Sequence, residues 1–217
     1  MNNQIFEDIA AVGIVPLIVM NEAADAAALA QALCAGQIPV AEVTFRTAAA
    51  REVMYEMAKS CPQLLLGAGT VHSIEQARMT LDCGGKFVIT PGLNPKVVDW
   101  CLSHELPVCP GTVTPSDLEV ALDFGLSLVK FFPAEAYGGV KTLKALKGPY
   151  AQLKFIPTGG VNLGNLKDYL SLENVAAAGG SFVPDEKQLS ARDFAGISAS
   201  CQALQKQVQS IRSARAA

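Results

Sequence analysis

Histidine is scarce in this sequence of 217 residues, which contains only His72 and His104. Neither belongs to an H-x-x-x-H pair and the sequence has no C-x-x-C pair, so the common patterns of a zinc site are absent. Neither histidine lies near a G-x-S-x-G turn, which argues against a Ser-His-Asp triad. We therefore predict no metal ion, and any catalysis has to rest on other side chains.

Charged residues are also few, at 17% of the chain, and neither sign dominates. The net charge is −3, so the chain has no excess of basic residues of the kind that is typical of nucleic-acid-binding proteins. An export signal would require a lysine or arginine before its apolar stretch, and none precedes the apolar stretch 10–20. That stretch contains Gly13 and Pro16 and is too short to span a bilayer. The sequence predicts a cytoplasmic protein without nucleic-acid or membrane partners.

The six cysteines show no disulfide pattern, because their spacing is irregular. We expect free thiols in a reducing compartment. Hydrophobic residues make up 50% of the chain, which is ample for a large core and argues against disorder.

Strand-like and helix-like segments alternate along the whole chain. Short β-branched runs bounded by Gly and Pro indicate strands, and the longer segments between them indicate helices. The expected strands are 14–20, 40–45, 64–68, 87–90, 107–109, 126–131, 153–156 and 175–178. The expected helices are 22–35, 48–59, 73–82, 95–103, 116–124, 139–146, 166–170 and 191–213.

This order predicts the fold class. Strict alternation requires parallel strands joined by helical crossovers, which is the α/β class. Eight such units predict a single (β/α)₈ TIM-barrel domain over residues 1–217. An open doubly wound sheet is the competing architecture, but no G-x-G-x-x-G follows the first strand, which disfavours its dinucleotide-binding form.

The second expected strand carries charges where apolar residues are due. Successive side chains point to opposite faces, so Glu42, Thr44 and Arg46 share one face while Val43 and Phe45 share the other. Helices cover the outer face of a parallel sheet and need apolar partners, which places Val43 and Phe45 outside. Glu42 and Arg46 are therefore expected inside the barrel, where charges are costly unless they are paired or used.

Lys130 is a single cation near the C-terminal end of the apolar sixth strand, where barrels carry their active sites. Its head group could simply escape to water. Apolar surroundings, however, disfavour the ammonium form, and a neutral amine can form a Schiff base with a ketone. With an interior Glu42 to move protons, Lys130 indicates imine chemistry.

The last two expected strands end in the glycine-rich turns 158–161 and 179–181. Glycines let backbone N–H groups approach an anion closely, and barrels often bind a substrate phosphate at this place. Gly-Gly pairs more commonly mark tight turns that need a positive φ. Because two pairs follow the seventh and eighth strands, they favour a phosphate or carboxylate site.

Taken together, these segments resemble the 2-keto-3-deoxy-6-phosphogluconate (KDPG) / 4-hydroxy-2-oxoglutarate (KHG) aldolase family. The matching segments follow the family's order between residues 10 and 185. They are E-V-T-F-R-T at 42–47, G-A-G-T-V at 67–71, P-G-L at 91–93, K-F-F-P-A-E at 130–135, P-T-G-G-V at 157–161 and G-G-S at 179–181.

The resemblance implies a class I aldolase on a TIM barrel that assembles as a homotrimer and acts on a small 2-keto acid without cofactor or metal. It implies that Lys130 is the Schiff-base lysine, that Glu42 is the general acid/base, and that Arg46 binds a substrate carboxylate. It further implies that the pyruvyl pocket is lined by Thr70, Pro91 and Phe132, and that the substrate contacts Thr158. The residues that it implies for binding the phosphate are Gly159, Gly160, Gly180 and Ser181.

The implied reaction is cleavage of KDPG to pyruvate and glyceraldehyde 3-phosphate, cleavage of KHG to pyruvate and glyoxylate, or both. Phe45 stands where the family pattern has leucine and should face the helices without effect on the chemistry, while Phe182, where tryptophan is frequent, leaves the substrate preference open. Three alternatives stay open. They are a 2-keto-3-deoxy-6-phosphogalactonate aldolase, a phosphosugar isomerase or epimerase that forms no imine, and a non-catalytic anion-binding barrel.

Overall fold

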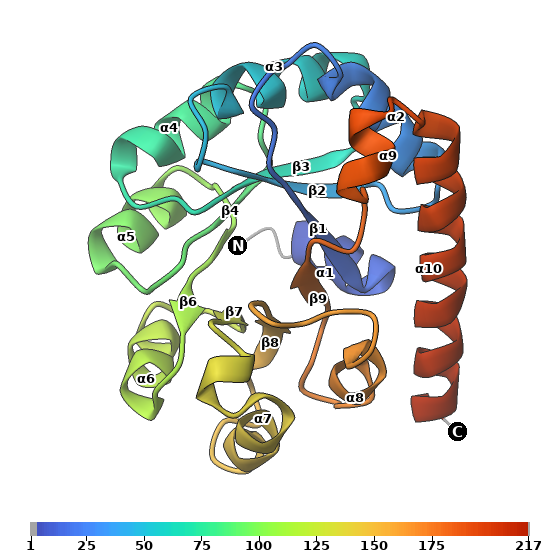
Figure 1. Cartoon of the computed structure of the whole chain (residues 1–217). Coiled ribbons are helices and arrows are strands. Elements are labelled where there is room, and N and C mark those ends of the chain that lie inside the picture. The colour runs from blue at the N-terminus through green and yellow to red at the C-terminus, as the bar shows by residue number, and fades with distance from the viewer. Residues whose placement is uncertain (1–3, 217) are drawn as a thin grey trace.

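A computed structural model describes residues 4–216, and parallel strands alternate with helices through it (Figure 1). The strands are β1 (Ile14–Ile18), β2 (Val40–Thr44), β3 (Leu65–Gly69), β4 (Phe87–Ile89), β5 (Val108–Cys109), β6 (Gly111–Thr112), β7 (Leu128–Phe131), β8 (Lys154–Pro157) and β9 (Ala178–Gly180). The helices are α1 (Gln4–Val12), α2 (Ala26–Ala35), α3 (Ala50–Ser60), α4 (Ile74–Asp82), α5 (Pro95–Ser103), α6 (Pro115–Asp123), η1 (Glu135–Tyr137), α7 (Gly139–Lys147), α8 (Leu166–Leu170), α9 (Glu186–Ser190) and α10 (Phe194–Ala216).

The strands form two curled sheets of parallel neighbours. One sheet has the order β5-β4-β3-β2-β1-β9 and the other the order β6-β7-β8. Pro110 separates β5 from β6, so one chain segment belongs to both sheets, and proline has no backbone N–H for the ladder. Isolated bridges join Phe155 to Val175 and Thr158 to Gly179 on the other side. The structure confirms an α/β fold built on a curled parallel sheet.

Apolar side chains divide between the two faces of the strands. Along β7, Val129 and Phe131 belong to a large outer core between strands and helices, whereas Leu128 belongs to a separate buried cluster. We call this second set the interior cluster, and it consists of Ile9, Val15, Val40, Phe87, Ile89, Cys109, Leu128, Ile156 and Ala177. Alternation of faces along a strand explains the two sets.

Helix α1 covers one end of the interior cluster, and the sequence analysis did not predict this helix. Ile9 of α1 is fully buried in the cluster, and the Phe6 ring lies 6.4 Å from that of Phe87 at the start of β4. Ile5, Phe6, Ile9 and Val12 follow a helical spacing, so the signal was present in the sequence. Within residues 4–216, no helix is both long enough and apolar enough to cross a membrane.

Some predicted boundaries are wrong. The sequence analysis predicts a helix from residue 22, but α2 begins at Ala26 and the residues before it form a loop. The predicted helix 191–213 corresponds to α10, which begins only at Phe194 because Arg192 has a φ of 53°, and the short helix α9 before it was not predicted. The predicted strand 175–178 lies at 178–180, because glycines of the presumed turn continue the pairing with β1.

Candidate active site

Strands β2 and β7 bring Glu42 and Lys130 together inside the curled sheet. The Lys130 Nζ lies 3.7 Å from the Glu42 Oε1, and the two residues are only 3% and 1% exposed. Val43 lies in the outer core and Phe45 packs against it, so Glu42 has the orientation that the alternation predicts. Two ionisable groups distant in sequence thus form a buried ion pair.

Burial dominates the electrostatics of this pair. It raises the pKa of the Glu42 carboxyl above its ordinary value, and the positive charges of Lys130 and then Arg46 oppose that shift. Within the described part of the chain, neither Glu42 oxygen accepts a hydrogen bond. A Cβ atom at Gly69 would collide with the Glu42 carboxyl, so the glycine leaves room for it. The carboxyl is therefore poised to take up a proton.

A cavity of about 850 Å³ opens beside the pair, at the C-terminal ends of the strands. It collects Arg46, Phe132, Thr158, Gly159, Gly160, Gly180 and Ser181 from the residues that the sequence analysis singled out. Lys130 and Glu42 do not line it, but the Lys130 Nζ lies 4.9 Å from the centre of the Phe132 ring, which does. Barrel active sites occupy this end of the strands.

Thr70 and Pro91 follow β3 and β4 at the same end but are not among the residues that line the cavity. Thr70 has a φ of 59°, a conformation that is uncommon outside glycine and recurs at functional sites. The oxygen of Pro91 lies so close to Gly111 that no side chain fits there. Both residues are half-buried.

The Thr158 hydroxyl is buried and has no hydrogen-bond partner among residues 4–216. Thr158 lines the cavity, and a Cβ atom at Gly179 would collide with this hydroxyl. A buried hydroxyl without a partner is costly, so a polar ligand atom in the cavity would satisfy it.

Gly159 and Gly160 form a turn that lines the cavity. The Glu135 N–H donates to the Gly159 oxygen at 3.0 Å, and the side-chain amides of Asn162 and Asn165 donate to the Gly160 oxygen at 3.0 and 3.1 Å. In a trans peptide the N–H points away from the C=O, so these bonds direct the N–H groups of Gly160 and Val161 to the opposite side.

Neither of those N–H groups donates to an acceptor within the described residues. Gly159 and Gly160 have φ values of 94° and 82°, which glycine adopts without strain. Free N–H groups that converge on a cavity favour an anion.

The sequence analysis missed the helix that borders the cavity. Pro184, Asp185, Glu186 and Leu189, at and in α9, line it together with Asn162. The Asp185 side chain accepts from the Lys187 N–H at 2.7 Å, which is a helix cap readable from the sequence. Between residues 4 and 216, no cluster of histidine, cysteine, aspartate or glutamate side chains could hold a metal ion.

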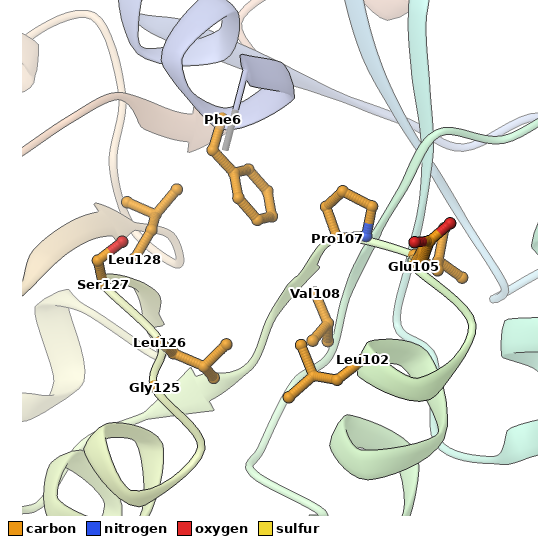
Figure 2. A pocket seen from close by; sticks show the side chains of 10 residues that line it. Phe6, Leu102, Glu105, Pro107, Val108, Gly125, Leu126, Ser127 and Leu128 are labelled. Carbon is orange, nitrogen blue, oxygen red and sulfur yellow. The ribbon is translucent and has the colours of Figure 1, made fainter. Parts of the chain in front are cut away.

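A second cavity, of about 500 Å³, lies at the opposite end of the strands (Figure 2). Phe6 points into it from α1, and residues around the starts of β5 and β7 form its walls. Glu105 is the charged residue of this lining, which includes no lysine or arginine and none of the predicted site residues. Its chemistry does not match a 2-keto acid.

Several known proteins with similar sequences belong to one family. The family model described as KDPG and KHG aldolase matches residues 5–200. The 2-dehydro-3-deoxy-phosphogluconate aldolase of Treponema pallidum is 44% identical over 195 residues, covering 90% of this chain and 93% of that protein. The KHG/KDPG aldolase of Escherichia coli is 41% identical over 181 residues, covering 83% and 85%.

A solved structure agrees. The KDPG aldolase of Legionella pneumophila, with pyruvate captured as a covalent carbinolamine intermediate, has a TM-score of 0.87 at 38% identity and covers 91% of this chain and 97% of that one. This chain therefore belongs to the KDPG and KHG aldolase family.

Proposed function

We propose that this protein is a class I aldolase that cleaves KDPG to pyruvate and glyceraldehyde 3-phosphate, and KHG to pyruvate and glyoxylate. The observation that carries the proposal is the buried Lys130–Glu42 pair beside a cavity at the C-terminal ends of the strands. An amine next to a carboxyl with raised proton affinity is what imine formation needs.

The reaction begins with the neutral Lys130 amine attacking the C2 carbonyl carbon of the substrate. Because burial raises the pKa of Glu42, its carboxyl can carry a proton, which it gives to the C2 oxygen as the carbinolamine hydroxyl forms. The carboxylate left behind then takes up the proton that the amine nitrogen gives up. The carbinolamine then loses water as its hydroxyl takes a proton from that carboxyl, and a protonated imine joins Lys130 to C2.

Cleavage uses the imine as an electron sink. The Glu42 carboxylate, directly or through a water, removes the proton of the C4 hydroxyl, and the C3–C4 bond breaks. The C4 oxygen becomes an aldehyde, and the bonding electrons move into the imine to give an enamine. Protonation at C3 and hydrolysis then release pyruvate and free Lys130. Since the imine accepts the electrons, we propose that the reaction needs no metal ion.

The cavity residues bind the rest of the substrate. Arg46 pairs with the carboxylate next to C2, and the Thr158 hydroxyl hydrogen-bonds the substrate. The pyruvyl part of the substrate is contacted by Thr70, Pro91 and Phe132. The phosphate is bound by Gly159, Gly160, Gly180 and Ser181.

The domain organisation and the closure of the barrel are also part of the proposal. We propose one domain over residues 1–217, in which the segment of β5 and β6 and the bridges between β8 and β9 close the two sheets into an eight-stranded barrel. The homotrimer that the resemblance implies and the cytoplasmic location that the sequence indicates stay predictions.

Trapping tests the imine directly. Incubation with pyruvate and borohydride should add one reduced pyruvyl group to wild-type protein, and peptide mapping should place it on Lys130. Lys130→Ala should show no adduct, whereas Lys154→Ala, which removes an exposed lysine of β8, should label like wild type. Wild-type protein without an adduct, or an adduct that persists in Lys130→Ala, would contradict the proposal.

Steady-state kinetics then rank the substrates. We expect cleavage of KDPG and KHG, measured by the pyruvate released. A higher kcat/KM for 2-keto-3-deoxy-6-phosphogalactonate would point to the opposite C4 configuration, and isomerisation of a phosphosugar without trapping would favour the imine-free alternative.

A further inference from the structure

Glu135 stands behind the turn of Gly159 and Gly160, on the side away from the cavity. It follows Lys130 by five residues and begins η1. Its backbone N–H donates to the Gly159 oxygen, and its carboxylate accepts a hydrogen bond from the Tyr169 hydroxyl of α8. One residue thus connects the segment after Lys130 both to the turn and to the helix that follows the turn.

Two glycines, Gly160 and Gly139, lie close against this pair. A Cβ atom at Gly160 would lie 2.5 Å from the Cγ of Glu135. A Cβ atom at Gly139 would lie 2.7 Å from the Tyr169 hydroxyl oxygen and 2.8 Å from the Glu135 Oε1. Real atoms do not approach so closely, so the two glycines leave room for the pair, and the Glu135 side chain sets the position of Gly160.

Tyr169 holds Glu135 in that position. The tyrosine is fully buried, whereas Glu135 is exposed and would otherwise be free to move. Burial, with the hydrogen bond and charge of Glu135, raises the pKa of Tyr169, so the phenol stays protonated and keeps its donor. A hydrogen bond to an ionised acceptor is stronger than one between neutral groups.

Neither residue reaches the substrate cavity. Glu135 and Tyr169 line a smaller cavity of about 350 Å³ beside α7 and α8, and the turn separates it from the substrate side. A change in this pair can therefore affect the substrate only through the position of the turn.

We propose that Glu135 and Tyr169 are positioning residues for the phosphate end of the substrate. They keep the turn in the one place where the Gly160 and Val161 N–H groups meet the phosphate. The inference rests on the proposed function. It predicts that the pair matters for KDPG, which carries a phosphate, and not for KHG, which ends in a carboxylate instead.

Kinetics on both substrates test this role. Tyr169→Phe and Glu135→Ala should each raise the KM for KDPG about tenfold while kcat changes less than about threefold, because a misplaced binding group acts mainly on binding. The KM for KHG should stay within about twofold of wild type. Glu135→Gln keeps an acceptor for Tyr169 and should recover most of the affinity for KDPG. Tyr55→Phe, on the exposed side of α3, is the matched control and should behave like wild type.

The outcomes separate this inference from the proposed function. Wild-type protein that cleaves neither substrate would contradict the proposed function itself. Active wild type with equal losses on KDPG and KHG in both variants would show a general structural role and overturn the inference. Unchanged KM for KDPG in Glu135→Ala, which alters an exposed side chain and should fold, would overturn it as well.

Discussion

The two ends of the strands differ in chemistry although they share the same interior. On β7, Leu128 belongs to the apolar interior cluster, and Lys130, two residues on, forms the buried ion pair. On β2, Val40 and Glu42 repeat this arrangement. Helix α1 covers the apolar end (Figure 1), while the polar end opens into the cavity with Arg46. On each of these strands, two positions only two residues apart thus differ in role, one packing in the core and the other taking part in the reaction.

The reactive end buries two ionisable groups, whereas the apolar end buries only packed side chains. Burial in the interior raises the pKa of Glu42, and the positive charges of Lys130 and Arg46 oppose that shift. Buried charges reduce the stability of a fold unless they are fully satisfied, and neither Glu42 oxygen has a hydrogen bond within residues 4–216. We infer that the apolar end stabilises the protein and offsets the unfavourable burial of the reactive end.

The largest expected effect is the loss of the reactive amine. Lys130→Ala should reduce kcat for KDPG cleavage by about 10⁴-fold or more, because no other group can form the imine. Pyruvate release in a coupled assay measures it, with Lys154→Ala as the control lysine. A loss below about 100-fold in Lys130→Ala would mean that the polar end does not carry the chemistry.

The next effect concerns the proton carrier. Glu42→Gln should reduce kcat by about 10²- to 10⁴-fold, the usual contribution of a general acid or base. The amide keeps the size of the side chain, so pyruvate should still bind and be trapped on Lys130 by borohydride. Cleavage kinetics like those of wild type would remove Glu42 from the mechanism.

The dependence of kcat on pH tests the role of Glu42 a second time. Burial raises the pKa of Glu42, so its carboxylate form is lost at a higher pH than for an exposed glutamate. Cleavage needs the carboxylate, so kcat should fall as the pH drops through this raised pKa. The acid limb should therefore lie at a higher pH than that of an ordinary exposed glutamate. An acid limb that persists unchanged in Glu42→Gln would assign it to another group.

At the apolar end the effect should be on stability alone. Ile9 of α1 is fully buried in the interior cluster, so Ile9→Ala should lower the free energy of unfolding by about 2–5 kcal/mol. Urea unfolding measures the loss, and kcat/KM well below the unfolding midpoint should match wild type. Ile5→Ala, at a partly buried position of the same helix, should lose less. A large fall in kcat for folded Ile9→Ala would show that the two ends are not separable.

The sequence predicts the reactive end better than the groups behind it. Face alternation is enough to expect Glu42 inside, and a cation in an apolar strand is enough to notice Lys130. The contact of Glu135 with Tyr169 joins residues 34 positions apart through the packing of η1 against α8, which no local pattern encodes. The bordering helix α9 offers only its Asp185 cap as a sequence signal, because its five residues are too few for a periodic pattern.

The smallest effect should come from making the reactive end resemble the apolar one. A double variant with Lys130→Met and Glu42→Met removes both buried charges and keeps unbranched side chains of similar length. Replacing a buried ion pair by apolar residues is often neutral or stabilising by about 1–4 kcal/mol, so the inactive double variant should unfold at a urea concentration equal to or above that of wild type. Lys130→Met alone should be less stable than the double variant, since Glu42 then stays buried without its cation. A double variant clearly less stable than wild type would mean that the pair itself stabilises the fold, and the proposed division between a stabilising and a reactive end would be wrong.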